Sequence, residues 1–131
     1  MLTAESIMTT DLVTISPEML IKDAIELLIQ KQISGLPVID NQGHLIGVIT
    51  EFAMLAMVYD REVQDQPVGQ HMTREVFTVE SSDPISRIAD LCIVHRVRRL
   101  PVMRDGKLVG LIARRDVLKA LYENSVQACC A

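Results

Sequence analysis

The sequence has 131 residues, of which 49% are apolar and 23% are charged, and its formal net charge is −4. The length predicts one domain, and the apolar fraction excludes a disordered chain. No apolar run approaches the roughly twenty residues that a membrane span needs. The first residues lack the basic and apolar regions of a secretory signal, and the cysteine usage does not indicate an oxidising compartment. We therefore expect a cytoplasmic protein.

The charge is unevenly distributed along the chain. Residues 1–65 hold three basic and ten acidic side chains, whereas residues 66–131 hold ten basic and seven acidic ones. The stretch from Arg96 to Arg115 carries seven basic side chains and a single acid, Asp105. Such a stretch favours binding of an anion, a phosphate or a nucleic acid. The alternative is a solvated face with no ligand.

The cysteines and histidines indicate neither a disulfide framework nor a metal site. Cys92 lies in an apolar helical stretch and is expected to be a small buried side chain. Cys129 and Cys130 end a polar tail, residues 123–131, that we expect to be disordered; a redox or lipid site is the alternative. Three histidines share no metal-ligand spacing, namely His44, His71 and His95. Since no nucleophile elbow, phosphate loop or Cys–His motif is present, we do not expect an enzyme.

The chain repeats itself. At an offset of 64 residues, Ile7-Met8-Thr9 aligns with His71-Met72-Thr73. One residue is then lost from the second copy, and at an offset of 63 Gly47 aligns with Gly110. The gap falls within a turn sequence in both copies, where a change of length costs little. The placement of the gap indicates a true duplication.

Each copy is predicted to fold as β-α-β-β-α. In the first helix, apolar residues recur at i, i+3, i+4 and i+7, which defines one helical face. The first copy contains strand Leu12–Ile15, helix Met19–Gln32, strands Leu36–Ile39 and Leu45–Thr50, and helix Glu51–Tyr59. The second contains strand Val76–Val79, helix Pro84–His95, strands Leu100–Met103 and Lys107–Ile112, and helix Arg114–Tyr122. Asp83 is the predicted N-cap before Pro84, and Asp105-Gly106 predicts a tight hairpin turn.

The copies set the predicted domain organisation. The first repeat spans residues 1–60, and residues 61–70 form a linker with a lead-in helix. Around these residues we expect a polar linker at Asp60–Gln66 and a short helix at Pro67–Met72. The second repeat spans residues 71–122. One such small sheet has little core of its own, so two copies are expected to face each other. The predicted fold class is α+β, with a pseudo-two-fold pair of small sheets and helices packed between them.

The repeated pattern resembles the CBS domain pair, the cystathionine β-synthase domain or Bateman module. The resemblance covers the chain from about Ile7 to Leu121. It rests on the Met-Thr segments that start both repeats, on Gly35-Leu36-Pro37-Val38 and Leu100-Pro101-Val102, and on the Gly-apolar-apolar ends of both third strands. The resemblance implies a regulatory module that binds adenine nucleotides in clefts between the repeats.

The family pattern Gly-x-x-Thr/Ser-x-x-Asp/Asn is only half kept in each repeat. In the first repeat Thr50 supplies the hydroxyl, but Ala53 replaces the acid; in the second Asp116 supplies the acid, but Ala113 replaces the hydroxyl. A carboxylate accepts two hydrogen bonds from a ribose diol, and a helix N-terminus beside it favours phosphate. The sites are therefore expected to be unequal, with the Asp116 site the better nucleotide candidate.

By resemblance, the base would lie against Phe77, Val97 and Leu111, and the phosphates near Arg98 and Arg99, because arginine suits phosphate oxygens. The candidate ligand-binding residues of the second repeat are Asp116, Arg98, Arg99, Arg115, Phe77, Val97, Leu111 and Ala113. Those of the first repeat are Val13, Ile33 and Thr50.

Each candidate has a structural alternative. A carboxylate such as Asp116 in the first turn of a helix stabilises that helix by about 0.3–1 kcal/mol without a ligand. Thr50 is equally suited to be an N-cap. Arg98 and Arg99 would contribute about 0–1 kcal/mol if they paired with surface acids, and Arg115 is suited to a solvated helix face. The apolar candidates would be core residues in any such unit.

Three functions remain open. The first is a regulatory module that binds AMP, ADP or ATP mainly at the Asp116 site and relays this to an unknown target protein. The second is a ligand-free scaffold for protein association. The third is nucleic-acid binding through the Arg96–Arg115 stretch, which the lack of interleaved aromatic residues disfavours. By resemblance a homodimer is expected, through Met54, Leu55, Met57, Val117, Leu118 and Leu121, unless these side chains fill the core. No cofactor is required by any of the three functions.

Overall fold

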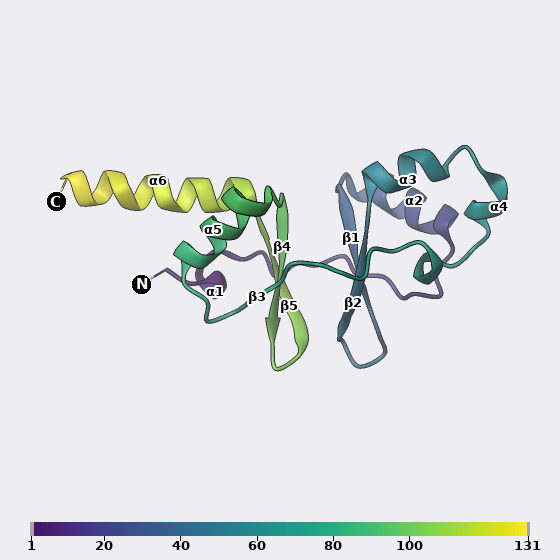
Figure 1. Ribbon diagram of the computed structural model, residues 1–131, viewed down its shortest axis with the longest axis horizontal. Helices are drawn as coiled ribbons and strands as arrows, with labels where there is room; N and C mark the ends of the chain where they lie inside the picture. Colours follow the sequence, from purple (N-terminus) through teal and green to yellow (C-terminus); the bar gives the residue numbers. More distant parts are fainter. Residues whose placement is uncertain (1, 131) are drawn as a thin grey trace. The chain divides into compact units, whose positions relative to one another are not determined.

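The computed structural model describes residues 2–130, and the side chains of residues 2–125. The chain forms two compact units. Unit 2 is the continuous segment Val13–Val76, and unit 1 combines residues 2–12 with residues 77–130. The described residues contain six α-helices and two small sheets (Figure 1), which confirms the mixed α+β class.

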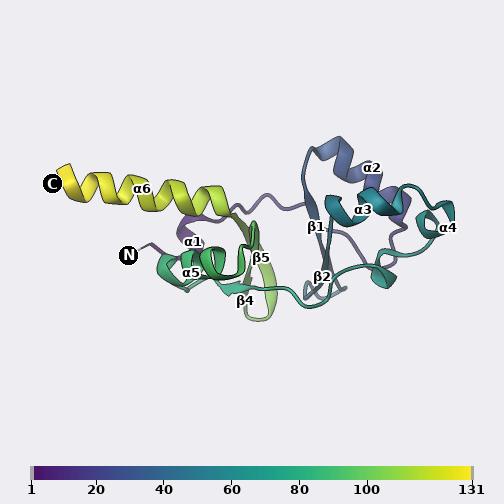
Figure 2. The ribbon, with the colours of Figure 1, turned by 45° about the horizontal axis from the view of Figure 1, so that its top comes forward.

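The elements follow the predicted order closely. Unit 2 contains α2 (Ile21–Lys31), β1 (Gly35–Ile39), β2 (Leu45–Thr50), α3 (Glu51–Met57), α4 (Arg61–Gln64) and the 3-10 helix η1 (Val68–Gln70). Unit 1 contains α1 (Ala4–Ile7), β3 (Val79–Glu80), α5 (Ile85–His95), β4 (Arg99–Arg104), β5 (Lys107–Ala113) and α6 (Arg114–Cys130). In each unit the longer helices lie to one side of the hairpin (Figures 1 and 2).

The two units share one sheet plan. In unit 1, β3 pairs parallel with β4, and β4 pairs antiparallel with β5. In unit 2, β1 pairs antiparallel with β2. The predicted strand Leu12–Ile15 is reduced there to a single parallel bridge between Ile15 and Val38, which takes the place that β3 has in unit 1. The strand prediction was therefore too long, because only one residue of this segment pairs.

The Met-Thr segments close each sheet on its other edge. Thr9 pairs antiparallel with Leu111 in unit 1, and Thr73 pairs in the same way with Val48 in unit 2. The Met-Thr segment that starts the first sequence repeat therefore belongs to unit 1, which holds most of the second repeat. The Met-Thr segment that starts the second repeat likewise belongs to unit 2, which holds most of the first repeat. The compact units thus divide the chain after residues 12 and 76, which differs from the predicted boundaries at residues 60 and 70.

Each unit buries its own apolar core. In unit 2 the largest fully buried side chains come from the first helix and the hairpin: Ile21, Leu36, Val38, Ile49 and, from η1, Val68. In unit 1 they are Ile88, Leu100, Val102 and Ile112. Cys92 lies in the core of unit 1, as predicted, and burial raises the pKa of its thiol despite the opposing effect of the Arg114 charge.

The hairpin turns account for the residue lost between the repeats. Asp105 and Gly106 have φ values of 52° and 80°, which fits the predicted two-residue turn with both central residues at positive φ. The longer turn of unit 2 is held by the Asp40 carboxylate, which accepts backbone N–H groups from His44 and Gln42, each at 2.9 Å. These hydrogen bonds, the one from His44 first, lower the pKa of Asp40.

Three local predictions need correction. Pro84, rather than Asp83, is the N-cap of α5. The Asp83 carboxylate instead accepts the backbone N–H of Glu80 at 2.8 Å and pairs with Arg87. The predicted polar linker contains the helix α4, because the Asp60 side chain caps it by accepting two backbone N–H groups.

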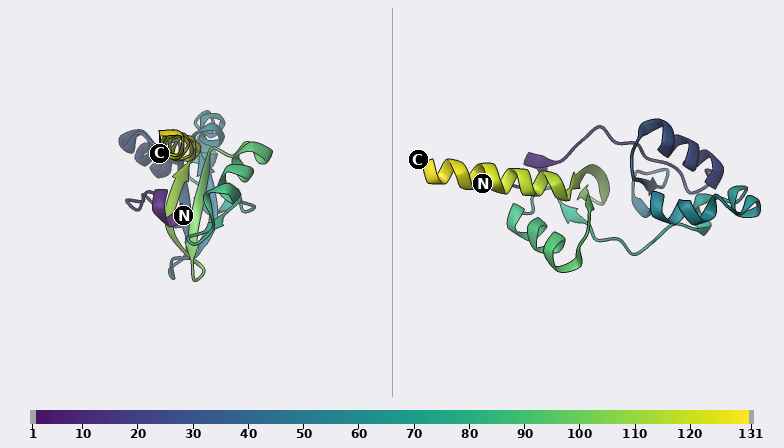
Figure 3. Two further views of the ribbon diagram at one scale, coloured as in Figure 1. Left: turned by 90° about the vertical axis from the view of Figure 1, so that its left-hand side faces the viewer. Right: turned by 90° about the horizontal axis from the view of Figure 1, so that it is seen from above.

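The third correction concerns the end of the chain. Helix α6 continues to Cys130 as one uninterrupted helix (Figure 3), into the stretch 123–131 that was expected to be disordered. Residues 123–130 contain neither glycine nor proline, so no helix-stopping signal is present. The side chains of Cys129 and Cys130 lie outside the described part, and so does the redox or lipid role considered for them.

Candidate functional site

The junction between β5 and α6 brings the candidate residues of unit 1 together. Helix α6 begins directly after β5, and the backbone N–H of Arg114 donates to the carbonyl of Arg98 at 2.8 Å. In the β4–β5 ladder Arg99 lies opposite Ala113. These contacts place Arg98 and Arg99 beside the start of α6, where Asp116 occupies the first turn.

All eight candidates of the second repeat lie in unit 1, and the three of the first repeat lie in unit 2. Asp116 and Ala113 are half-buried at the junction, and Leu111 is half-buried on β5. Val97 packs against the core of unit 1. Phe77 is 46% exposed and does not belong to that core. For Phe77 the alternative of a core role is therefore wrong.

The charged groups at this junction have no partners within the described side chains. Five exposed arginines form no ion pair there; they are Arg96, Arg98, Arg99, Arg114 and Arg115. The ion pairs that do form involve other cations, such as Arg104 with Glu5 at 2.8 Å. Asp116 likewise makes no hydrogen bond or ion pair among these residues. The alternative that Arg98 and Arg99 pair with surface acids is therefore wrong.

The equivalent junction of unit 2 differs in chemistry. The Glu51 backbone N–H donates to the Ser34 carbonyl at 2.9 Å, as Arg114 does to Arg98. However, the Thr50 hydroxyl accepts the backbone N–H of Ala53 at 3.2 Å. Thr50 is therefore the N-cap of α3, which confirms the structural alternative for this residue. Since Ala53 supplies no carboxylate, the unit 2 junction has backbone geometry for the site but lacks its acid and its arginines.

One residue at this end of unit 1 was missed by the sequence analysis. The imidazole of His95 stacks on the Phe77 ring, with centroids 4.3 Å apart and planes 25° from parallel. The sequence analysis named His95 only among the histidines that share no metal-ligand spacing. The pairing could not be found from spacing, since 18 positions separate the two residues in the sequence.

The predicted dimer surface is divided by the structure. Met54 and Val117 are each 3% exposed and fill the cores of their units, and Met57 packs against the core of unit 2. Leu55, Leu118 and Leu121 are exposed.

No group of three or more metal-ligating side chains occurs among the described residues. None of the helices described is both long and apolar enough to cross a membrane.

The comparisons with known proteins identify the family. The model of the CBS domain matches residues 4–60 and again residues 68–123. The chain therefore belongs to the CBS domain family, as a tandem pair. The crystal structure of CBSX2 in complex with AMP, a protein of Arabidopsis thaliana, matches with a TM-score of 0.83 and 32% identity, over 94% of this chain and 98% of that one.

Relatives with longer chains also match. Protein MJ1225 of Methanocaldococcus jannaschii is 29% identical over 88% of this chain, and inosine-5'-monophosphate dehydrogenase of the same organism is 33% identical over 88%. The chain spans 41% of the length of the first relative and 23% of the second. These relatives therefore share the paired repeats with this chain, alongside further sequence of their own.

Proposed function

We propose that this chain is a regulatory module that binds an adenosine nucleotide, AMP, ADP or ATP, at the β5–α6 junction of unit 1. The observation that carries the proposal is the set of unpartnered charges there. A half-buried carboxylate, Asp116, and five arginines meet at one end of the unit without ion-pair partners among the described side chains. A cluster of like charges raises the local concentration of counter-ions, which for arginines are anions such as phosphate.

The chemistry of the two groups matches the two ends of a nucleotide. An ionised carboxylate accepts hydrogen bonds only, so Asp116 suits the two hydroxyl groups of a ribose. Arg98 and Arg99 have guanidinium groups that donate in a fixed fork, which suits phosphate oxygens. The AMP complex of CBSX2, a relative at 32% identity, supports the assignment of this ligand class.

The same argument makes the junction of unit 2 a poor nucleotide site. Ala53 stands where unit 1 has Asp116, and the positions of Arg98 and Arg99 are taken by Ser34 and Gly35. The Thr50 hydroxyl already caps α3. We infer that the junction of unit 2 binds no ribose, and that one nucleotide binds per chain.

The test is a thermal-shift panel of AMP, ADP, ATP, S-adenosylmethionine and NADH on the wild type and on Asp116→Ala. A ligand at 100 times its Kd stabilises the folded state by about 2.7 kcal/mol. We expect a shift with an adenosine nucleotide for the wild type and none for the variant, because the alanine cannot hold the ribose.

Glu51→Ala is the matched control. Glu51 is a carboxylate in the first turn of α3, the equivalent helix of unit 2, so both substitutions remove about 0.3–1 kcal/mol of helix-dipole stabilisation. The control should keep the nucleotide response. If Asp116→Ala also keeps it, Asp116 only stabilises its helix. If no ligand shifts the wild type, the scaffold alternative is favoured.

We further propose that two chains associate through the second helices of the repeats, α3 and α6, together with Val58 and Tyr59, which follow α3. Nucleotide binding would then change a surface that the dimer presents to a target protein. Three exposed positions recur in both repeats: Leu55 and Leu118, Val58 and Leu121, and Tyr59 and Tyr122. Exposed apolar and aromatic side chains in such a stripe are typical of interfaces.

We expect sedimentation velocity to give a dimer for the wild type and a monomer for Leu55→Asp/Leu118→Asp. An Ala56→Asp/Lys119→Asp control should stay dimeric. A wild-type monomer at all concentrations tested would contradict this.

A further inference from the structure

The exposed faces of α3 and α6 share their apolar positions but differ in charge. Leu55 and Leu118 occupy equivalent positions on the two helices, and both are exposed. Four residues earlier, Glu51 begins α3 and Arg114 begins α6, and residues four apart are neighbours on a helix. Both charged side chains are exposed, and neither forms an ion pair within the described part of the chain. Each helix therefore presents an unpaired charge beside an apolar surface.

The next position of the two helices adds a second complementary pair. Phe52 in α3 is 85% exposed, and the equivalent residue of α6 is Arg115, which is also exposed. Each lies three residues before the leucine of its helix, so each borders the same face. A guanidinium group over an aromatic ring gains cation–π attraction. The start of α3 is thus acidic and aromatic, whereas the start of α6 carries two guanidinium groups.

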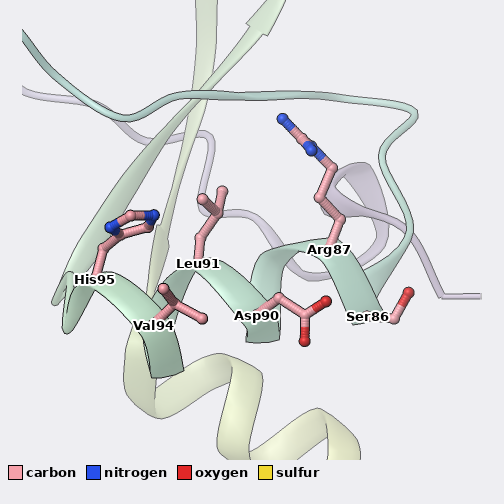
Figure 4. A pocket seen from close by; sticks show the side chains of 6 residues that line it. All are labelled: Ser86, Arg87, Asp90, Leu91, Val94 and His95. Carbon is pink, nitrogen blue, oxygen red and sulfur yellow. The ribbon is translucent and has the colours of Figure 1, made fainter.

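The charge difference is confined to the second helices of the repeats. In α2, two basic and two acidic side chains balance. Apart from His95, the charged side chains of α5 are Arg87 and Asp90, which line a hollow along that helix (Figure 4). These two also balance, and Arg87 already pairs with Asp83. The first helices of the repeats therefore give no electrostatic preference for one arrangement of two chains over another.

The whole units differ in the same sense as α3 and α6. Unit 2 holds nine acidic and four basic side chains, whereas unit 1 holds eight acidic and nine basic ones. Unit 2 is therefore strongly acidic and unit 1 slightly basic. Since charge complementarity selects between the ways in which two surfaces can meet, unit 2 of one copy is matched to unit 1 of another.

We propose that two copies of the chain pair head to tail, so that α3 of each copy packs against α6 of the other. The proposal rests on the dimer proposed above and assigns its orientation. Head-to-head pairing would join two acidic faces at α3 and two basic faces at α6, and juxtaposed like charges disfavour an interface. Head-to-tail pairing brings Glu51 of one copy to the helix of the other that carries Arg114 and Arg115. A two-fold axis repeats this contact, so it occurs twice per dimer.

This orientation has a consequence for the proposed nucleotide site. Asp116 lies in the first turn of α6, two residues after Arg114. The helix that would hold the ribose therefore contacts unit 2 of the other copy, where Ala53 replaces the acid. Each nucleotide site would border a junction that binds no ribose. Arg98 and Arg99 precede α6 and remain available for phosphate.

Charge reversal tests the orientation through the dissociation constant of the dimer, measured by sedimentation equilibrium. Glu51→Arg and Arg114→Glu should each raise this constant about tenfold, because each turns two attractive contacts into repulsive ones. The double variant Glu51→Arg/Arg114→Glu should return close to the wild-type value, since it only exchanges the two charges. Lys119→Glu, which reverses an exposed charge on another face of α6, is the matched control and should change the constant little.

The alternatives to this result are distinct. Head-to-head pairing predicts no rise in either single variant, because one pair of like charges replaces another; that result would overturn the proposal. A damaged fold does not explain a weaker dimer of Arg114→Glu, since an acid at a helix N-terminus stabilises the helix. Added salt should weaken the wild-type dimer if unlike charges meet, and a dimer strengthened by salt would contradict the head-to-tail orientation.

Cross-linking measures the orientation directly. In a chain with Cys129→Ser and Cys130→Ser, we place one cysteine on the apolar stripe, as Leu55→Cys or as Leu118→Cys. Head-to-tail pairing predicts that a short bismaleimide joins the two variants when they are mixed and joins neither variant to itself. A Leu55→Cys chain joined to itself would overturn the orientation and leave the dimer intact. A wild-type monomer would instead contradict the dimer itself.

Discussion

Removal of residues 2–10 is expected to unfold unit 1 while unit 2 stays folded. Ala4 is fully buried in the core of unit 1, and the Glu5 backbone N–H donates to the Ser81 carbonyl at 3.0 Å. Thr9 and Leu111 exchange two backbone hydrogen bonds, of 2.8 and 3.0 Å. Loss of the buried apolar side chains and of these hydrogen bonds should cost at least about 3 kcal/mol. This is a large part of the roughly 5–15 kcal/mol that stabilises a typical domain.

Hydrogen exchange monitored by mass spectrometry measures this effect unit by unit. Peptides from β4 and β5 should lose protection, whereas peptides from β1 and β2 should keep it. Addition of a synthetic peptide of residues 2–12 should restore protection to β4 and β5. Equal loss or equal retention of protection in the two hairpins would contradict the assignment of the first segment to unit 1.

Gly47→Ala is expected to destabilise unit 2 more than Gly110→Ala destabilises unit 1. A Cβ at Gly47 would lie 2.6 Å from the Met72 sulfur and 2.9 Å from the Thr73 carbonyl oxygen. That carbonyl accepts the Val48 backbone N–H, so it cannot move without loss of the bridge that closes the sheet. A Cβ at Gly110 would meet only the Met8 side chain among its nearest neighbours, at 2.5 Å from the sulfur.

Overpacking of this kind costs about 1–3 kcal/mol, and we expect Gly47→Ala near the upper end. Rescue by a second substitution separates a clash with the methionine side chain from a clash with the backbone carbonyl. Met8→Ala should relieve most of the Gly110→Ala loss, because it removes the sulfur and the Cγ and leaves only the Cβ of residue 8, at 3.0 Å. Met72→Ala should relieve Gly47→Ala only in part, because the Thr73 carbonyl remains. Urea unfolding of the four variants and the two methionine controls measures these differences; full rescue in both units would show that the backbone contact has no effect.

The sequence repeat predicted most of the local structure. The strand Leu45–Thr50 was predicted at its observed bounds, and Asp105-Gly106 forms the predicted turn. These elements depend on neighbouring residues, through alternation of apolar side chains and through positive φ. The same local information missed the αL residues Gln32 and Arg96 that end α2 and α5 at equivalent positions, because glycine is the usual signal there.

Long-range pairing was less accessible from the sequence. The repeat shows that residues 7–9 and 71–73 are alike, but likeness does not say which sheet each segment closes. For the candidate site, Asp116 was predicted from the half-kept family motif, and Arg98 and Arg99 were predicted by resemblance to the same family. It did not predict that the arginines lack ion-pair partners or that His95 stacks on Phe77, because both facts depend on side-chain positions in space.

The division of the chain into one continuous and one discontinuous unit sets an order of events during synthesis. Unit 2 uses residues 13–76 alone, so it has all its strands and helices once those residues have left the ribosome. Unit 1 joins Thr9 to Leu111, and closure of so long a loop makes its folding slower. The first twelve residues therefore remain unpaired while unit 2, which follows them in the sequence, folds. A chain interrupted before β5 would consist of one finished unit and one exposed fragment of the other.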